Sequence, residues 1–190
     1  MSKSPCCASF LSRLSCQPDR LPRLTHSVRQ PYALTVPIET DMMMRALDLA
    51  RQAGALGEVP VGAVIYRSAD GAILGQGFNR REIDNDPLAH AEIAAIAAAA
   101  KSLGDWRLND CTLVVTLEPC AMCAGAIVNA RVGRLIYGAS DPKAGACGSL
   151  MRLTEDPRLN HRVIPEAGLM AAECGDVLRE FFRKLRKPGA

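Results

Sequence analysis

The chain has 190 residues, of which 48% are hydrophobic and 23% charged, and it carries a net charge of +3. These proportions are ordinary for a folded globular protein and allow one domain with a sizeable core. The sequence contains no run of eighteen apolar residues and therefore predicts no transmembrane helix. Its eight cysteines are scattered rather than arranged as a disulfide framework, which indicates a reducing compartment, so we expect a cytoplasmic protein without membrane contact.

The positive charge is concentrated at the start of the chain. Residues 1–37 carry five basic residues and one acidic residue, whereas residues 38–190 carry 18 basic and 19 acidic residues, a net charge of −1. Residues 1–37 are rich in Ser, Pro and Arg and lack an apolar period, which predicts a disordered N-terminal extension. A transit peptide, or an over-long start with the fold beginning near residues 42–44, is the alternative. Residues 38–190 are the predicted folded domain, and any RNA binding there must use a local basic patch.

Helical and strand patterns alternate along the predicted domain. Apolar residues at helical spacing predict an amphipathic helix over residues 41–56. Strand-like runs on either side of a turn predict a β-hairpin over residues 60–67 and 72–78. Further along we expect helices over residues 89–100, 121–130 and 169–187 and strands over residues 112–117, 134–138 and 162–164. A hairpin followed by alternating strands and helices predicts an α/β fold with a mixed sheet packed between helices.

Two short motifs carry the strongest chemical signal: His-Ala-Glu at residues 90–92 and Pro-Cys-Ala-Met-Cys at residues 119–123. His90, Cys120 and Cys123 supply the three protein ligands of a catalytic zinc, which leaves its fourth position for water. Such a water becomes a nucleophile near neutral pH, and Glu92 is close enough to His90 to move its protons. A structural zinc would need a fourth ligand, and the sequence offers no second Cys-x-x-Cys or His-x-x-x-His to supply it.

The expected elements bring the two motifs to helix N-termini. His90 lies in the first turn of the helix expected over residues 89–100, and Cys120 and Cys123 lie in the opening turn of the next helix. Residues at positions i and i+3 share a helix face, so the two sulfur atoms can converge on one ion. The positive end of the helix dipole favours their thiolate forms. The sequence therefore predicts a zinc site built from two helix N-termini.

The His-x-Glu and Pro-Cys-x-x-Cys motifs resemble the signature of zinc-dependent nucleobase deaminases. From about residue 40 to about residue 187 the chain is similar to one branch, the bacterial tRNA-specific adenosine deaminases. The zinc motif alone would fit a cytidine, guanine or adenosine deaminase, whereas the stretch from Asp141 to Ser149 and the basic C-terminal helix favour the tRNA branch. The similarity is carried by residues 58–64, 77–80, 86–92, 116–126, 138–149 and 160–163.

The resemblance implies a cytidine-deaminase-like three-layer α/β/α fold with a central mixed five-stranded sheet. It implies hydrolytic deamination of adenosine to inosine at the wobble position of a tRNA anticodon loop, with Glu92 as the catalytic proton shuttle. It further implies one Zn²⁺ per subunit, held by His90, Cys120 and Cys123, and a homodimer. A deaminase for a free base or nucleoside, of cytosine or guanine type, is one alternative, and an RNA-binding module with a structural zinc is another.

Five further residues are candidate substrate contacts. The resemblance suggests that the amide of Asn79 binds the base or ribose and that Asp141 contacts the ribose or nearby backbone, although each is also a common turn residue. Lys143 lies on the same loop as Asp141 and is a candidate phosphate contact. In the basic C-terminal run, Arg183 is a second candidate phosphate contact. Of the adjacent Phe181 and Phe182, we expect one to pack inward and the other to offer a stacking surface to a loop base, and Phe181 is the candidate. The alternative for this run is a solvated helix end.

Overall fold

The computed structural model describes residues 37–186, and within them five strands form one mixed sheet in the order β2-β1-β3-β4-β5. Strand β1 pairs antiparallel with both β2 and β3, whereas β3, β4 and β5 run parallel to one another. The expected extension at residues 1–37 lies outside the described residues apart from Pro37. The strands are β1 (Gly62–Arg67), β2 (Ile73–Phe78), β3 (Cys111–Leu117), β4 (Arg134–Ala139) and β5 (Pro165–Ala167).

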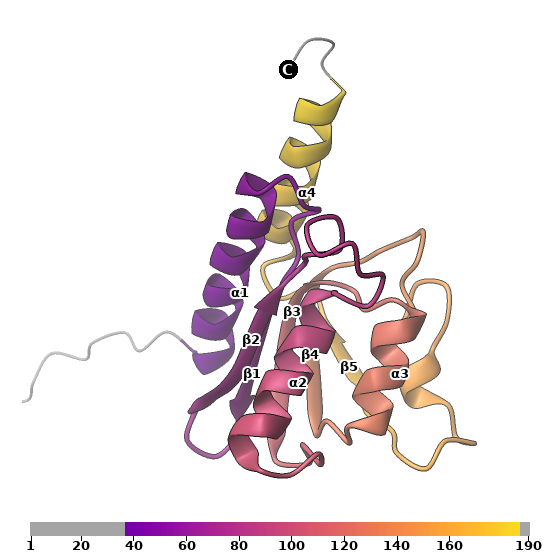
Figure 1. Cartoon of the computed structure of the whole chain (residues 1–190). Helices are drawn as coiled ribbons and strands as arrows, with labels where there is room; N and C mark the ends of the chain where they lie inside the picture. The colour runs from indigo at the N-terminus through magenta and orange to yellow at the C-terminus, as the bar shows by residue number, and fades with distance from the viewer. Residues whose placement is uncertain (1–36, 187–190) are drawn as a thin grey trace, which may run out of the picture. The chain divides into compact units, whose positions relative to one another are not determined.

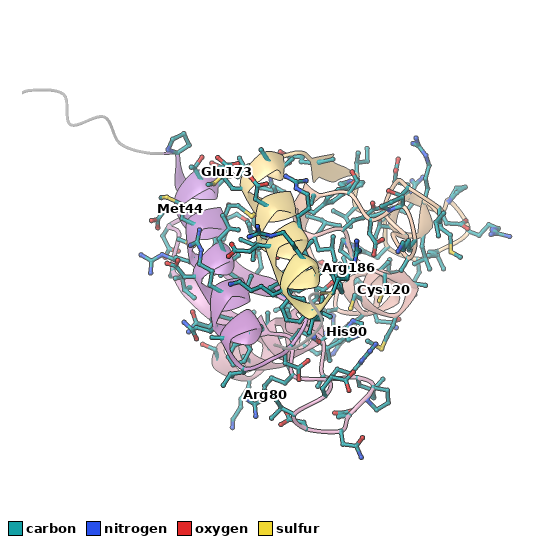
Figure 2. All side chains as sticks on the ribbon, turned by 90° about the horizontal axis from the view of Figure 1, so that it is seen from above. Met44, Arg80, His90, Cys120, Glu173 and Arg186 are labelled. Atoms are coloured by element: carbon teal, nitrogen blue, oxygen red, sulfur yellow. The ribbon has the colours of Figure 1, made fainter. Side chains whose placement is uncertain are left out.

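Four α-helices cover the two faces of the sheet. Helices α1 (Ile38–Ala55) and α4 (Ala171–Leu185) run side by side on one face, as Figures 1 and 2 show. Helices α2 (Ala91–Leu103) and α3 (Ala121–Asn129) lie on the other face, and a short 3₁₀ helix η1 (Leu153–Glu155) packs near α3. None of the helices within residues 37–186 combines the length and the apolar character that a bilayer crossing needs.

Strand β3 shows why the sheet is buried on both sides. Successive residues of a strand point to opposite faces. Leu113 and Val115 belong to the core formed with α2 and α3, whereas Val114 belongs to the core formed with α1 and α4. All three side chains are fully buried. A central strand that is apolar on both faces requires helices on both, and the predicted three-layer α/β/α fold with a mixed five-stranded sheet is confirmed.

Small residues set the position of α2 against the sheet. A Cβ atom at Gly75 or Gly77 of β2 would overlap the backbone carbonyls of Ala95 and Ala91, so only glycine allows this approach. The alanines on the inner face of α2 are correspondingly buried. The helix ends at Gly104, which has a left-handed φ of 71°. This close packing holds the N-terminus of α2, and with it His90, at a fixed place beside the ends of the strands.

The last two elements begin later in the chain than the sequence predicts. The final strand was expected over residues 162–164, but β5 is Pro165–Ala167, because Leu135 of β4 pairs with Pro165. The Val163 backbone N–H donates instead to the Thr154 carbonyl, and the Ile164 side chain is 77% exposed. Helix α4 begins after Met170, whose φ of 51° ends the preceding turn.

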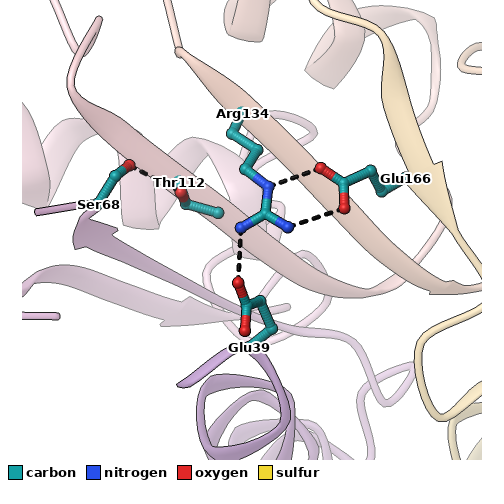
Figure 3. Close-up of polar contacts among 5 residues, drawn as sticks. All are labelled: Glu39, Ser68, Thr112, Arg134 and Glu166. Carbon is teal, nitrogen blue, oxygen red and sulfur yellow. Dashed lines mark hydrogen bonds and ion pairs between the residues drawn. The ribbon is translucent and has the colours of Figure 1, made fainter. Parts of the chain in front are cut away.

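An ion-pair cluster ties the start of α1 to the edge of the sheet (Figure 3). The Arg134 guanidinium of β4 donates to both carboxylate oxygens of Glu166 in β5, at 2.6 and 2.8 Å, and to Glu39 of α1 at 2.7 Å. Arg134 thereby lowers the pKa of both carboxyl groups. The cluster is partly exposed, so it orients α1 on the sheet more than it contributes to stability. Beside it, the Ser68 and Thr112 hydroxyl groups share a hydrogen bond of 2.8 Å.

Candidate active site

The three expected metal ligands converge in the structure. The His90 Nδ1 atom lies 3.7 Å from the Cys120 sulfur and 3.5 Å from the Cys123 sulfur. In tetrahedral zinc coordination, Zn–S bonds of about 2.3 Å and Zn–N bonds of about 2.0 Å place nitrogen and sulfur ligands about 3.5 Å apart. The three side chains therefore fit a zinc ion, and no fourth His, Cys or acidic residue within residues 37–186 joins the group. Three ligands leave one coordination position for water, as in a catalytic site.

Helix ends deliver these ligands. His90 is the residue before α2 and Cys120 the residue before α3, and both have extended backbone conformations. Hydrogen bonds with Cys123 and His90 lower the pKa of the Cys120 thiol to about 3. Hydrogen bonding with Cys120 and burial raise the pKa of the Cys123 thiol, which favours its protonated form. A divalent cation releases such protons when it binds, which is how cysteine sites become thiolate sites.

Glu92 lies beside the metal ligands in the second position of α2. Its side chain is only 4% exposed, and burial raises its pKa above the ordinary value for a glutamate. A carboxyl group with a raised pKa is suited to accept a proton and return it within one reaction cycle. Glu92 and two of the expected ligands, His90 and Cys120, line the same cavity.

The cavity has a volume of about 210 Å³ and is shared by three of the expected site residues outside the metal group. Pockets for drug-sized ligands are commonly about 300–1,000 Å³, so this one suits a smaller group such as a single base. Asn79, Asp141 and Glu92 all line it. The Asp141 Oδ1 atom also accepts hydrogen bonds from the backbone N–H groups of Lys143, at 2.9 Å, and Ala144, at 3.3 Å, which is the turn-capping role named as the alternative.

A second hollow of about 690 Å³ opens next to the cavity and shares Val59, Leu117 and Asp141 with it. One wall is the loop after β4, which includes Lys143. The other wall is α4, which contributes cationic and aromatic side chains, and Figure 2 shows Arg186 on the same side of the molecule as His90 and Cys120. We call this hollow the basic groove; its residues from α4 are Leu178, Arg179, Phe182 and Arg183, and Arg186, directly after the helix, lines it as well.

Two neighbouring phenylalanines of α4 point in different directions. Phe181 lies outside the basic groove, in a hollow against α1 that Gly54 and Pro60 also line. Phe182 lines the basic groove and is 38% exposed. The candidate stacking residue therefore moves from Phe181 to Phe182. Arg183 and Lys143, the two candidate phosphate contacts, both line the basic groove.

Comparison with known proteins agrees with this site. The family model of MafB19-like deaminases matches residues 39–186. A tRNA-specific adenosine deaminase of Haemophilus influenzae is 49% identical over 77% of this chain and 84% of its own length. The chain belongs to the tRNA-specific adenosine deaminase family.

Solved structures place this family member among the deaminases. One comes from a study of A-to-I editing by tRNA:A34 deaminases at the wobble position of transfer RNA; it is 46% identical, covers 73% of this chain and 99% of its own, and has a TM-score of 0.69. A guanine deaminase from Nitrosomonas europaea is 25% identical, covers 85% of this chain and 93% of its own, and has a TM-score of 0.67. The fold is thus shared by deaminases of different substrates, and the substrate must be argued from the site.

Two buried glutamates beside the site were not singled out in the sequence. Glu58 is fully buried and accepts hydrogen bonds from the Asn79 side-chain amide, at 3.0 Å, and from the Ile83 backbone N–H, at 2.7 Å. Glu118 is 2% exposed and directly precedes the Pro119-Cys120 segment. Each glutamate stands one or two residues before a proline in a stretch shared with the family. The sequence feature that could have identified both glutamates is a charged residue beside an apolar, strand-like run.

Proposed function

We propose that this protein deaminates the wobble adenosine of a tRNA anticodon loop to inosine, releasing ammonia. The observation that carries the proposal is the continuity of the small His90–Glu92 cavity with the basic groove. The cavity has room for one base, and the groove offers cations and an aromatic ring for the flanking nucleotides. A relative that is 49% identical has the name tRNA-specific adenosine deaminase.

Glu92 performs the proton transfers in this proposal. His90, Cys120 and Cys123 would hold a zinc ion, and a bound zinc would make a water molecule nucleophilic near neutral pH. Glu92 accepts one proton from the water that attacks C6 of adenine and passes it to N1. It then accepts the proton of the new C6 hydroxyl group and passes it to the departing amino group. Its burial excludes bulk water from this exchange and keeps its pKa raised. Adenosine and water are thereby converted to inosine and ammonia.

Asn79, together with the basic groove, orients the target nucleotide. The Asn79 Nδ2 group donates within the protein to Glu58 and to the Val59 carbonyl, which leaves its Oδ1 atom to accept from the base or ribose. Lys143 and Arg183 bind phosphates of the loop, and Phe182 offers a ring on which a splayed base can stack. The bases of an anticodon loop are unpaired, so the target leaves its stack at low cost.

The proposal also includes the bounds of the catalytic domain, the oligomeric state and the compartment. We assign the deaminase domain to residues 38–190 and one zinc to each subunit. Helix α3 contains no charged residue, and its Met122, Gly125 and Ala126 are partly exposed. An apolar surface of this kind is typical of a subunit interface, which supports a homodimer. A tRNA substrate is met in the cytoplasm, where we expect the enzyme to act.

The competing function is deamination of a free base, as in the guanine deaminase that shares the fold. The basic groove argues against it, because a free base needs no phosphate contacts. The test is to incubate the protein with an anticodon stem-loop that has adenosine at the wobble position, and separately with free adenosine, guanine and cytosine, followed by nucleoside analysis. We expect inosine from the stem-loop and no product from a matched stem-loop with guanosine at that position. Product from free guanine or cytosine, with none from the stem-loop, would overturn the proposal.

A further inference from the structure

Glu118 stands at the end of β3, between the sheet and the metal ligands. Its backbone N–H donates to the Ala139 carbonyl at 2.8 Å, so the residue is held by β4 as well. Its side chain is 2% exposed and turns toward the loop that follows β4 rather than toward solvent. A buried carboxylate is expensive unless it is fully hydrogen-bonded, and the partners of this one are all in that loop.

Four donors of the loop surround the Glu118 carboxylate. The Oε2 atom accepts from the Asp141 backbone N–H at 3.0 Å and from the Ser149 hydroxyl group. The Oε1 atom accepts from the backbone N–H groups of Cys147, at 3.1 Å, and Ser149, at 2.9 Å. An ionised carboxylate offers about four acceptor sites, so the loop uses all of them. No acceptor is left for a substrate, although Glu118 forms part of the cavity wall.

The loop is also fastened to the segment that carries the metal ligands. Gly145 forms an isolated bridge with Cys120, and the Ala146 N–H donates to the Pro119 carbonyl at 2.9 Å. A Cβ atom at Gly145 would collide with the Glu118 carboxylate, so glycine is required where the loop lies over it. The loop backbone is therefore fitted around the carboxylate.

We propose that Glu118 is a positioning residue, whose carboxylate holds residues 141–149 in the conformation that receives the RNA. The loop that is hydrogen-bonded to Glu118 contains Asp141, which lines both the cavity and the basic groove, and Lys143, which lines the groove. Hydrogen bonds to Asp141 at one end and Ser149 at the other fix both ends of the loop. The role rests on the proposed function, because it predicts an effect on binding of the stem-loop rather than on the proton transfers.

The central test replaces Glu118 with glutamine, which keeps the size of the side chain but turns one acceptor into a donor that faces N–H groups. We expect KM for the anticodon stem-loop to rise at least ten-fold, kcat at saturating RNA to change less than three-fold, and zinc content to stay at the wild-type level. Leu108→Ala is the stability control, because Leu108 is fully buried beyond the opposite end of β3. A Leu108→Ala protein with the same loss of Tm should keep a wild-type KM.

A second variant displaces the Glu118 carboxylate by steric overlap and leaves its charge unchanged. Gly145→Ala should reproduce the rise in KM, because its methyl group displaces Glu118. Gly54→Ala is the matched control, since a Cβ atom there meets its nearest neighbour, Pro60, at an ordinary 3.5 Å. If Glu118→Gln fails to fold, Gly145→Ala decides the question. A KM no higher than that of the controls, or a loss of kcat alone, would overturn the positioning role.

Amide hydrogen exchange separates this proposal from the proposed function. In Glu118→Gln the amides of residues 141–149 should exchange at least ten-fold faster than in the wild type, while those of α2 remain protected. This readout needs no substrate. If the wild type fails to produce inosine, the proposed function fails, and the exchange result still decides whether Glu118 holds the loop. Unchanged exchange in residues 141–149 would contradict the inference even in an active enzyme.

Discussion

The Asn79 side-chain amide donates a hydrogen bond of 3.0 Å to the buried carboxylate of Glu58. Because a carboxylate can only accept, this contact fixes which end of the Asn79 amide faces the cavity. The Nδ2 group also donates to the Val59 carbonyl at 3.3 Å, so the Oδ1 atom is the end available to the substrate. Asn79 thus presents an acceptor, which in the proposed function would receive a hydrogen bond from a donor group of the nucleotide.

Glu58→Gln should weaken substrate binding through Asn79. A glutamine at position 58 can present its own NH₂ group to Asn79, and the Asn79 amide then loses its fixed orientation. A hydrogen bond to a charged group contributes about 1.5–3 kcal/mol, so we expect KM for the stem-loop to rise about ten-fold or more. Steady-state kinetics on the stem-loop measure this. Glu82→Gln is the control, because Glu82 is 72% exposed and pairs with Arg81. If the two variants change KM equally, Glu58 has no specific role in substrate binding.

The metal group was predictable because its pattern is local. The ligand spacing of Cys120 and Cys123 is one helical turn, and the turn before α2 places His90 at a helix start. The roles of Glu58 and Glu118 were not predictable in this way. Their partners lie 21 residues away at Asn79 and 31 residues away at Ser149, and nothing in the local pattern specifies such pairings.

Tertiary packing also decides which of two adjacent residues faces a site. Phe181 and Phe182 differ by about 100° around a helix, so the sequence could indicate an aromatic contact without indicating which ring makes it. Packing of α4 against α1 decides it, because Phe181 faces Gly54 and Pro60. Strand β5 was placed three residues early for a related reason, since its register is set by pairing with β4 rather than by its own hydrophobic pattern.

Glu92→Gln should keep the metal and lose the chemistry. The amide has nearly the same volume but cannot accept and return a proton, a role that contributes about 10²–10⁴-fold to the rate. The measurement is the single-turnover rate of inosine formation, together with zinc content by elemental analysis. A zinc-loaded variant with turnover near that of the wild type would refute the role of Glu92.

Cys120→Ala and Cys123→Ala should each release zinc and lower Tm. Metal that binds only the native state stabilises it, and removal of a ligand removes that stabilisation. Cys174→Ala is the matched control, since Cys174 is buried like Cys123 but contacts Met43 on the other face of the sheet. Full zinc occupancy in either ligand variant would exclude that cysteine from the metal group.

The Arg134 cluster should make a small part of the stability depend on pH. Hydrogen bonds from Arg134 lower the pKa of Glu39 and of Glu166 below the ordinary 4.5. A lowered folded-state pKa adds stability above the unfolded-state value, and this is lost as pH falls through the folded-state value. Because the groups are partly exposed, we expect Arg134→Met to cost about 1 kcal/mol or less at pH 7. Denaturant unfolding should show the two proteins converging below about pH 4; a difference that persists at lower pH would contradict this electrostatic origin.

Neutralising the basic groove should weaken RNA binding without slowing the chemical step. The variant replaces Lys143, Arg183 and Arg186 with glutamine, because these cations line the groove. Arg179 also lines it but pairs with Asp176, and Lys184 pairs with Glu180 and lies on the α1 side. Each lost phosphate contact should reduce the slope of log K against log salt by about 0.7 for a single strand. A salt titration of stem-loop binding measures this slope.

The matched control removes the same charge elsewhere, with Arg45, Arg51 and Lys101 replaced by glutamine. These side chains lie outside the basic groove, and Arg45 and Arg51 pair with Asp41 and Asp48 on the surface of α1. If binding depended only on net charge, both triple variants would lose the same affinity and slope. If the groove cations contact the RNA phosphates, the groove variant should lose more affinity and more salt slope than the control. The single-turnover rate at saturating RNA should be unchanged in both variants. Equal salt slopes for the two variants would place the RNA on another surface of the protein.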